Sequence, residues 1–168
     1  MPIVGPANLK AKMDQKSFHI RSYVDKDEPR VARLWREVFP DAPAWNRPEE
    51  DIRRKLSVQR DLFLVAEDGE QITGTAMAGY DGHRGWVYYV AVALDWRRRG
   101  LGSALMAEVE RRLAQLGCPK LNLQVRAVNE EVVSFYRHLG YTVEERISLG
   151  KHLTPLTGNA AGNKLEDV

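Results

Sequence analysis

The stretch Val90–Glu110, "VAVALDWRRRGLGSALMAEVE", decides the fold because it joins a buried strand to a long helix through a glycine-containing turn. The preceding run, Trp86–Leu94, is apolar on both faces, which is typical of a covered central strand. From Gly100 onward, apolar residues recur at helical spacing until Gly117, a natural end for a helix. The stretch therefore predicts a strand, a basic turn and an amphipathic helix.

The turn itself predicts an anion-binding site. The first N–H groups of a helix lack intrahelical partners, and the helix dipole places partial positive charge there. Gly100 and Gly102 let the backbone approach a ligand closely, and three arginines add charge beside them: Arg97, Arg98 and Arg99. This combination suits a diphosphate. The spacing R-x-x-G-x-G matches neither the dinucleotide fingerprint nor the Walker motif.

Outward from this turn, the chain alternates between strand and helix patterns. The expected elements are a strand at Phe18–Tyr23, helices within Asp25–Phe39 and Pro43–Ser57, strands at Leu62–Glu67 and Gln71–Tyr80 around an Asp68-Gly69 hairpin, the strand and helix described above, a strand at Lys120–Ala127, a helix at Glu130–Gly140, and a strand at Tyr141–Leu149. This order predicts a mixed α/β sheet with helices on its faces.

Composition favours a globular chain with a core of its own. Of 168 residues, 43% are hydrophobic and 29% are charged. No apolar run approaches the roughly 20 residues that cross a bilayer, and the N-terminal stretch lacks the apolar region of a secretory signal. The lone Cys118 cannot form an internal disulfide, and nothing near it suggests a metal site. We therefore expect a cytoplasmic protein with no metal and no membrane partner.

The chain shows no linker and no internal repeat, so we expect one domain over residues 17–150. Residues 1–16 are expected to form a flexible N-terminal arm, and residues 151–168 a flexible C-terminal tail. The net charge of +2 arises from 25 basic and 23 acidic residues, which argues against nucleic acid as a partner.

Two separated motifs resemble those of one enzyme superfamily. Arg97-x-x-Gly100-x-Gly102, after the strand "YYVAVALDW", resembles the acetyl-CoA motif of the GNAT superfamily of N-acetyltransferases. Leu123–Tyr141, "LQVRAVNEEVVSFYRHLGY", is similar to the second half of the same motif set. The resemblance covers about Phe18–Leu149, and the segments "PAWNRPEEDIRRK" and "GYDGHRG" resemble the YpeA-like branch of the superfamily.

The resemblance implies a GNAT fold and acetyl-CoA as co-substrate. The implied sheet is mixed, mostly antiparallel and six- to seven-stranded, with helices on both faces. Its fourth strand splays from its fifth, and the pantetheine arm of acetyl-CoA lies between them. The implied cofactor contacts are pantetheine contacts at Val90, Ala91 and Val92, diphosphate contacts at Arg97, Arg98, Arg99, Gly100, Leu101, Gly102 and Ser103, and one contact at Asn129. By residue type, Asn129 is also a good helix N-cap.

The resemblance also implies direct acetyl transfer to a primary amine of a small molecule or peptide. Tyr136 matches the tyrosine that protonates the departing CoA thiolate; the alternative for Tyr136 is a core aromatic. A phenol, with a pKa of about 10, is a suitable acid for a thiolate whose conjugate acid has a pKa of about 8.5. The backbone N–H of Val92 is the expected donor to the oxyanion.

Two positions depart from the family pattern. Leu94 stands where the family often has proline. Gln124 stands where ribosomal-protein alanine acetyltransferases have a glutamate base, and an amide cannot accept the proton. The general base is therefore unassigned, with Glu67, Asp81, His83 or a water chain as candidates.

Alternatives remain beside the N-acetyltransferase. A non-catalytic acetyl-CoA sensor or interaction module with the GNAT fold is the second hypothesis, and a nucleic-acid binder ranks last. The acceptor is open among a peptide N-terminus, a lysine, a polyamine, an amino acid and an aminoglycoside, and a homodimer is compatible with the superfamily. Tyr88 and Tyr89 are expected on opposite faces of their strand, one in the core and one facing the acceptor. An exposed Trp45 is a further candidate for the acceptor pocket.

Overall fold

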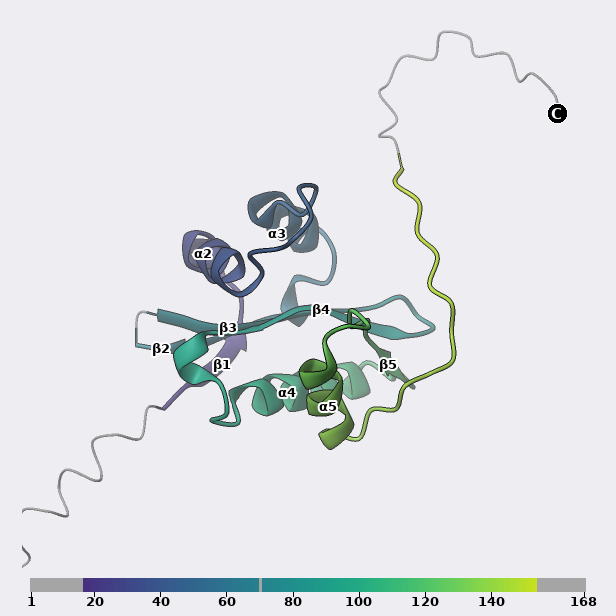
Figure 1. Cartoon of the computed structure of the whole chain (residues 1–168). Helices are drawn as coiled ribbons and strands as arrows, with labels where there is room; N and C mark the ends of the chain where they lie inside the picture. The colour runs from purple at the N-terminus through teal and green to yellow at the C-terminus, as the bar shows by residue number, and fades with distance from the viewer. Residues whose placement is uncertain (1–16, 70, 154–168) are drawn as a thin grey trace, which may run out of the picture.

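The computed structural model describes residues 17–69 and 71–153. The arm expected at residues 1–16 and most of the expected tail lie outside these residues. The described chain forms a five-stranded mixed sheet between two layers of helices, with α2 and α3 on one face and α4 and α5 on the other (Figure 1). Within this part of the chain, no helix is long and apolar enough to cross a membrane.

The order of elements follows the prediction up to the last helix. The strands are β1 (His19–Ser22), β2 (Phe63–Asp68), β3 (Gln71–Tyr80), β4 (Gly85–Val92) and β5 (Leu121–Asn122). The α-helices are α2 (Glu28–Val38), α3 (Pro48–Leu56), α4 (Leu101–Gln115) and α5 (Glu130–His138). Short 3-10 turns lie at Asp25–Asp27, Arg60–Leu62 and Leu94–Trp96. Gly117 and Gly140 adopt positive φ angles just after α4 and α5, as expected for helix ends.

The sheet order is β1-β2-β3-β4-β5, antiparallel as far as β4. The hairpin between β2 and β3 is confirmed, with Gly69 at φ 59°. Strand β5 runs parallel to β4 but pairs with it at only two positions, Gly85 with Leu121 and Trp86 with Asn122. Beyond these pairs β4 continues without β5, whereas the splay of the fourth strand from the fifth stays a prediction.

The prediction of six to seven strands is wrong for the described residues, which contain five. The strand expected at Lys120–Ala127 is limited to Leu121–Asn122, and the segment Tyr141–Leu149 belongs to no strand. Tyr141 N–H donates to Tyr136 O at 3.0 Å, and side chains of the segment add an ion pair from Lys120 to Glu144 and a hydrogen bond from Gln124 to Ser148. Alternating residues favour an extended chain, but they do not provide a neighbouring strand to pair with.

Two apolar layers hold the helices to the sheet. Leu101, Leu105 and Met106 of α4 are fully buried against one face, and Trp35 of α2 is buried against the other. Gly74 of β3 allows α4 to approach, because a Cβ there would lie 2.9 Å from Leu105 Cδ1. This close approach sets the distance of α4, and hence of its N-terminal turn, from the sheet.

Strand β4 contains a bulge that sequence alternation does not reveal. Its register against β3 shifts between the pairs Met77–Tyr88 and Thr75–Ala91, and Tyr89 adopts φ 50°. The extra residue turns Tyr89 onto the same face as Tyr88, toward α2 and α3. The expectation that the two tyrosines point to opposite faces is therefore wrong.

Candidate active site

The N-terminus of α4 is open to a ligand. Gly100 precedes the helix at φ 79°, and no side chain caps the first turn. The first intrahelical bond runs from Ala104 N–H to Gly100 O, at 2.9 Å, so the N–H groups of residues 101–103 have no intrahelical partner. Arg97, Arg98 and Arg99 are exposed beside this turn. The structure thus brings together the bare amides and the positive charge that the sequence predicts.

The two glycines of the turn differ in their surroundings. A Cβ at Gly100 would meet no atom within 4 Å, so its positive φ angle is what favours glycine there. A Cβ at Gly102 would lie 3.2 Å from Phe135 Cζ and 3.6 Å from Val92 Cγ2. Gly102 therefore allows α4, α5 and β4 to meet closely beside the turn. Arg99 also contacts the ring of Trp96, with its guanidinium 6.0 Å from the ring centroid.

Backbone groups of β4 have no strand partner at the parting from β5, although Arg97 Nε–H donates to Val92 O at 3.5 Å. Ala93 N–H donates to Thr73 O of β3 at 2.9 Å, and Ala91 pairs with Thr75 of β3. Because amides alternate along a strand, the backbone groups of Val90 and Val92 point to the opposite side, where β5 has left the sheet. Of the three predicted pantetheine contacts, Val90 and Val92 have backbone groups facing the parting, whereas those of Ala91 face β3.

A buried hydrogen-bond relay holds the bulge that precedes these groups. Trp35 Nε1–H donates to Thr75 Oγ1 at 2.8 Å, and the Thr75 hydroxyl donates to Tyr89 O at 2.8 Å. The Tyr89 ring stacks on the indole of Trp35 with centroids 3.8 Å apart, and its hydroxyl donates to Asp51 Oδ2 at 2.6 Å. Sequence reasoning missed this relay. The available signal was a buried threonine within an apolar strand, which requires a hydrogen-bond partner.

Tyr136 lies on α5 in the layer beneath the sheet. Its side chain is buried and makes edge contacts with Phe135 and Tyr141, with centroids 5.0 and 5.6 Å away. Burial raises the pKa of Tyr136 to about 12, so the phenol stays protonated at neutral pH. Its hydroxyl makes no hydrogen bond with the residues that the structure describes. Asn129 caps α5 as expected, accepting from Val132 N–H at 3.4 Å.

The candidate general bases are engaged elsewhere. Glu67 lies on β2, two strands from β4, and a hydrogen bond from Arg21 lowers its pKa. Asp81 accepts backbone N–H bonds from Arg84 and His83 in the β3–β4 turn, which lowers its pKa. His83 is exposed in the same turn. None of the three lies beside the free edge of β4, and the general base stays unassigned.

A mixed sheet that parts beside an uncapped helix start is the arrangement that the resemblance to GNAT acetyltransferases predicts. The chain belongs to the Acetyltransferase (GNAT) family, whose model matches residues 28–141. A curated relative, Acetyltransferase YE1169 from Yersinia enterocolitica, is 46% identical over 136 residues, which cover 81% of this chain and 96% of the relative. The protein is therefore an acetyltransferase. Placement in the YpeA-like branch stays a prediction.

Solved structures share the fold at low sequence identity. Ard1 from Thermoplasma volcanium has a TM-score of 0.68 at 23% identity, over 76% of this chain and 84% of that one. Aminoglycoside N-acetyltransferase AAC(6')-Iy in complex with CoA has a TM-score of 0.67 at 20% identity, over 81% of this chain and 95% of that one. These likenesses support the GNAT-like fold and leave the acceptor open.

Proposed function

We propose that this acetyltransferase is an N-acetyltransferase that moves the acetyl group of acetyl-CoA directly to a primary amine of a small molecule or peptide. The observation that carries the proposal is the free edge of β4, with the backbone groups of Val90 and Val92, beside the uncapped start of α4. Acetyl-CoA fits this arrangement, because a peptide-like arm finds unpaired strand groups and a diphosphate finds bare amides.

The diphosphate contacts rest on backbone more than on side chains. The N–H groups of residues 101–103 lack intrahelical partners, and Gly100 holds the turn that presents them. Arg97, Arg98 and Arg99 add long-range attraction for a polyanion and are exposed. Loss of one arginine should therefore weaken CoA binding less than distortion of the turn. Asn129 remains a proposed cofactor contact in addition to its capping role.

The transfer step requires an oxyanion donor and an acid. The acceptor nitrogen forms a bond to the acetyl carbon while the bond from that carbon to sulfur breaks. The Val92 N–H is aimed away from β3 and is the proposed donor to the carbonyl oxygen. Tyr136 gives its proton to the departing thiolate and regains one, through water, from the amine. Burial raises the pKa of this phenol to about 12, so the proton that it would give to the thiolate is present throughout the neutral pH range.

Acetyl-CoA binding and amine-dependent thiol release test this proposal together. Wild-type protein should be stabilised thermally by acetyl-CoA and should release CoA thiol when supplied with a primary amine from a broad panel. Tyr136→Phe should lower kcat at least about ten-fold with little change in acetyl-CoA affinity, because the ring contacts persist while the acid is lost. Unchanged turnover in this variant would remove Tyr136 from the mechanism.

Measurements of acetyl-CoA binding test the cofactor site separately from the acetyl-transfer reaction. Gly100→Val should abolish acetyl-CoA binding, since a β-branched residue strains the positive φ angle of the turn. Unchanged affinity would refute the diphosphate site. Tight acetyl-CoA binding without thiol release on any amine would instead favour a sensor with this fold.

A further inference from the structure

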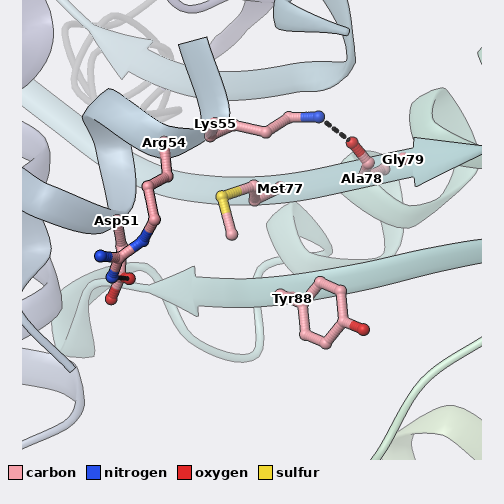
Figure 2. Close-up of a pocket in the computed structure, with 7 residues that line it drawn as sticks. All are labelled: Asp51, Arg54, Lys55, Met77, Ala78, Gly79 and Tyr88. Carbon is pink, nitrogen blue, oxygen red and sulfur yellow. Dashed lines mark hydrogen bonds and ion pairs between the residues drawn. The ribbon is translucent and has the colours of Figure 1, made fainter. Parts of the chain in front are cut away.

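A second feature lies on the face of the sheet that carries α2 and α3. A pocket of about 290 Å³ opens between α3 and strands β3 and β4 (Figure 2). Its walls are Asp51, Arg54 and Lys55 of α3, Met77 and Gly79 of β3, and Tyr88 of β4. Tyr88 follows the last β4–β5 pair by two residues, so the pocket adjoins the parting on the side opposite α4 and α5.

The carboxylate in this pocket is already satisfied. Asp51 forms an ion pair with Arg54 through one oxygen and accepts the hydroxyl of Tyr89 through the other, at 2.6 Å. Figure 2 shows Asp51 and Arg54 together at one end of the pocket. An incoming ammonium group therefore finds no free negative charge among these lining residues.

Lys55 is the charge in the pocket without a counter-charge. Its ammonium donates one hydrogen bond, to Ala78 O at 2.5 Å, and forms no ion pair with the described residues. An ammonium has three N–H donors, so two remain. Burial lowers the pKa of Lys55 to about 8, which still leaves it mostly charged at neutral pH. The Tyr88 hydroxyl, bonded to no described residue, is a further donor in the same space.

One N–H of the Lys55 ammonium has a structural role at the edge of β3, and the other two N–H groups have no such role. Strand β2 begins at Phe63, which pairs with Met77, so β3 has no β2 partner beyond that point. Lys55 covers Ala78 O on this free edge, and Gln59 covers Tyr80 in the same way. A glutamine performs this role without a charge, so covering the edge does not explain a half-buried ammonium.

We propose that this pocket binds the acetyl acceptor, and that the acceptor is a small primary amine that also carries a carboxylate, held by Lys55. This inference rests on the proposed function for the transfer itself. A pocket of about 290 Å³ suits a molecule of amino-acid size. A half-buried lone cation attracts a carboxylate and repels a polyamine or an aminoglycoside, which carry several positive charges.

Equilibrium binding tests the pocket without requiring turnover. The full chain, saturated with CoA, is titrated by NMR with N-acetylglycine, N-acetyl-L-alanine and N-acetyl-L-leucine, each against its primary amide. At least one acid should bind about ten-fold more tightly than its amide. Lys55→Met should abolish that difference, and Lys55→Arg should keep most of it. Equal affinity of acid and amide in all three pairs, or an unchanged acid affinity in Lys55→Met, would overturn the inference.

Matched controls separate the charge of Lys55 from the fold. Arg53→Met removes a neighbouring charge from the exposed side of α3 and should leave every affinity within about two-fold. Gly79→Val fills the pocket from its floor, where an added Cβ meets Gln59 Oε1 at 3.4 Å and Lys55 Nζ at 3.9 Å. This variant should weaken the acid and the amide together. If Arg53→Met reduced the preference for the acid over the amide as much as Lys55→Met does, the preference would arise from the overall positive charge of α3 and not from Lys55.

Turnover distinguishes failure of this inference from failure of the proposed function. Thiol release is measured with L-alanine, L-leucine, their amides and spermidine, and Lys55→Met should lower kcat/KM for the amino acids alone. Acetylation of amides and spermidine with no dependence on Lys55 would refute the pocket assignment and keep the N-acetyltransferase. Acid-selective binding with no thiol release from any amine would refute the N-acetyltransferase and keep the anion site.

Discussion

Thr75→Val tests whether the relay beneath the bulge positions the reacting backbone. Valine matches threonine in shape but removes the hydroxyl, which accepts from Trp35 Nε1–H and donates to Tyr89 O, both at 2.8 Å. Thr75 is fully buried, so water does not replace these bonds readily. The change leaves one buried donor and one buried acceptor unpaired.

The expected loss of stability is roughly 2–6 kcal/mol, because each of the two unpaired buried groups costs roughly 1–3 kcal/mol. Tyr89 also holds a left-handed conformation that costs roughly 1–2 kcal/mol, which the relay helps to offset. Once released, the bulge shifts the amides of Val90 and Val92. Loss of a well-placed oxyanion donor costs on the order of 100-fold in kcat, so a partial displacement should lower kcat about ten-fold.

Thr73→Val is the matched control on the same strand. Thr73 is equally buried but donates a single 3.2 Å bond to Ala66 O, away from the bulge. It should cost about 1 kcal/mol with kcat unchanged. Urea denaturation and steady-state thiol release give both quantities. If Thr75→Val costs no more than Thr73→Val and retains full turnover, the relay does not position the site. Trp35→Phe, which keeps the stacked ring and removes one donor, is the fallback if Thr75→Val fails to fold.

Three further outcomes follow from contacts described above. Gly74→Ala should lose roughly 1–3 kcal/mol in urea denaturation, because the new Cβ lies 2.9 Å from Leu105 Cδ1 and 3.1 Å from a β4 carbonyl; a stability equal to wild type would refute the close approach of α4. The pKa of Glu108 is lowered from 4.5 to about 2, chiefly by the hydrogen bond from Arg111, so its stabilisation is complete above about pH 4.5 and is lost as pH falls toward 2. The melting temperature of Glu108→Gln should accordingly lie below that of wild type at pH 7, and the difference should narrow steadily as pH falls from about 4.5 toward 2; a constant difference would contradict this. The pKa of Tyr136, raised to about 12, predicts that kcat shows no fall due to this phenol below about pH 10.

The sequence allowed prediction wherever a local rule settles the structure. The turn at Gly100 and the helix after it follow from positive φ, apolar spacing and the stop at Gly117. Asn129 as a cap follows from residue type in the same way. These features depend on neighbours within a few positions, so local rules were sufficient to predict them.

Non-local pairing was not predictable in the same manner. Every residue of "WVYYVAV" is apolar or aromatic and suits either face of the sheet. The sequence therefore lacks the alternation of polar and apolar residues that would reveal the extra residue at Tyr89. The segment Tyr141–Leu149 has the pattern of a strand, yet a strand requires an edge to join, and that depends on the whole sheet. In the sequence, Lys55 is one of several basic residues on a short helix. Only the folded structure, in which its ammonium lies over β3 and donates to Ala78 O, distinguishes it from the others.

Because β5 pairs with β4 at only two positions, this sheet also contains an unpaired strand edge in its interior. From Val87 onward one side of β4 is an edge strand, and unpaired strand edges are templates on which other chains add and aggregate. Many proteins protect such edges with charged side chains or with bulges. Here the bulge at Tyr89 twists β4, and the charged Arg97 donates from Nε to Val92 O at 3.5 Å. We therefore expect a molecule that binds along this edge to protect the protein against edge-to-edge association.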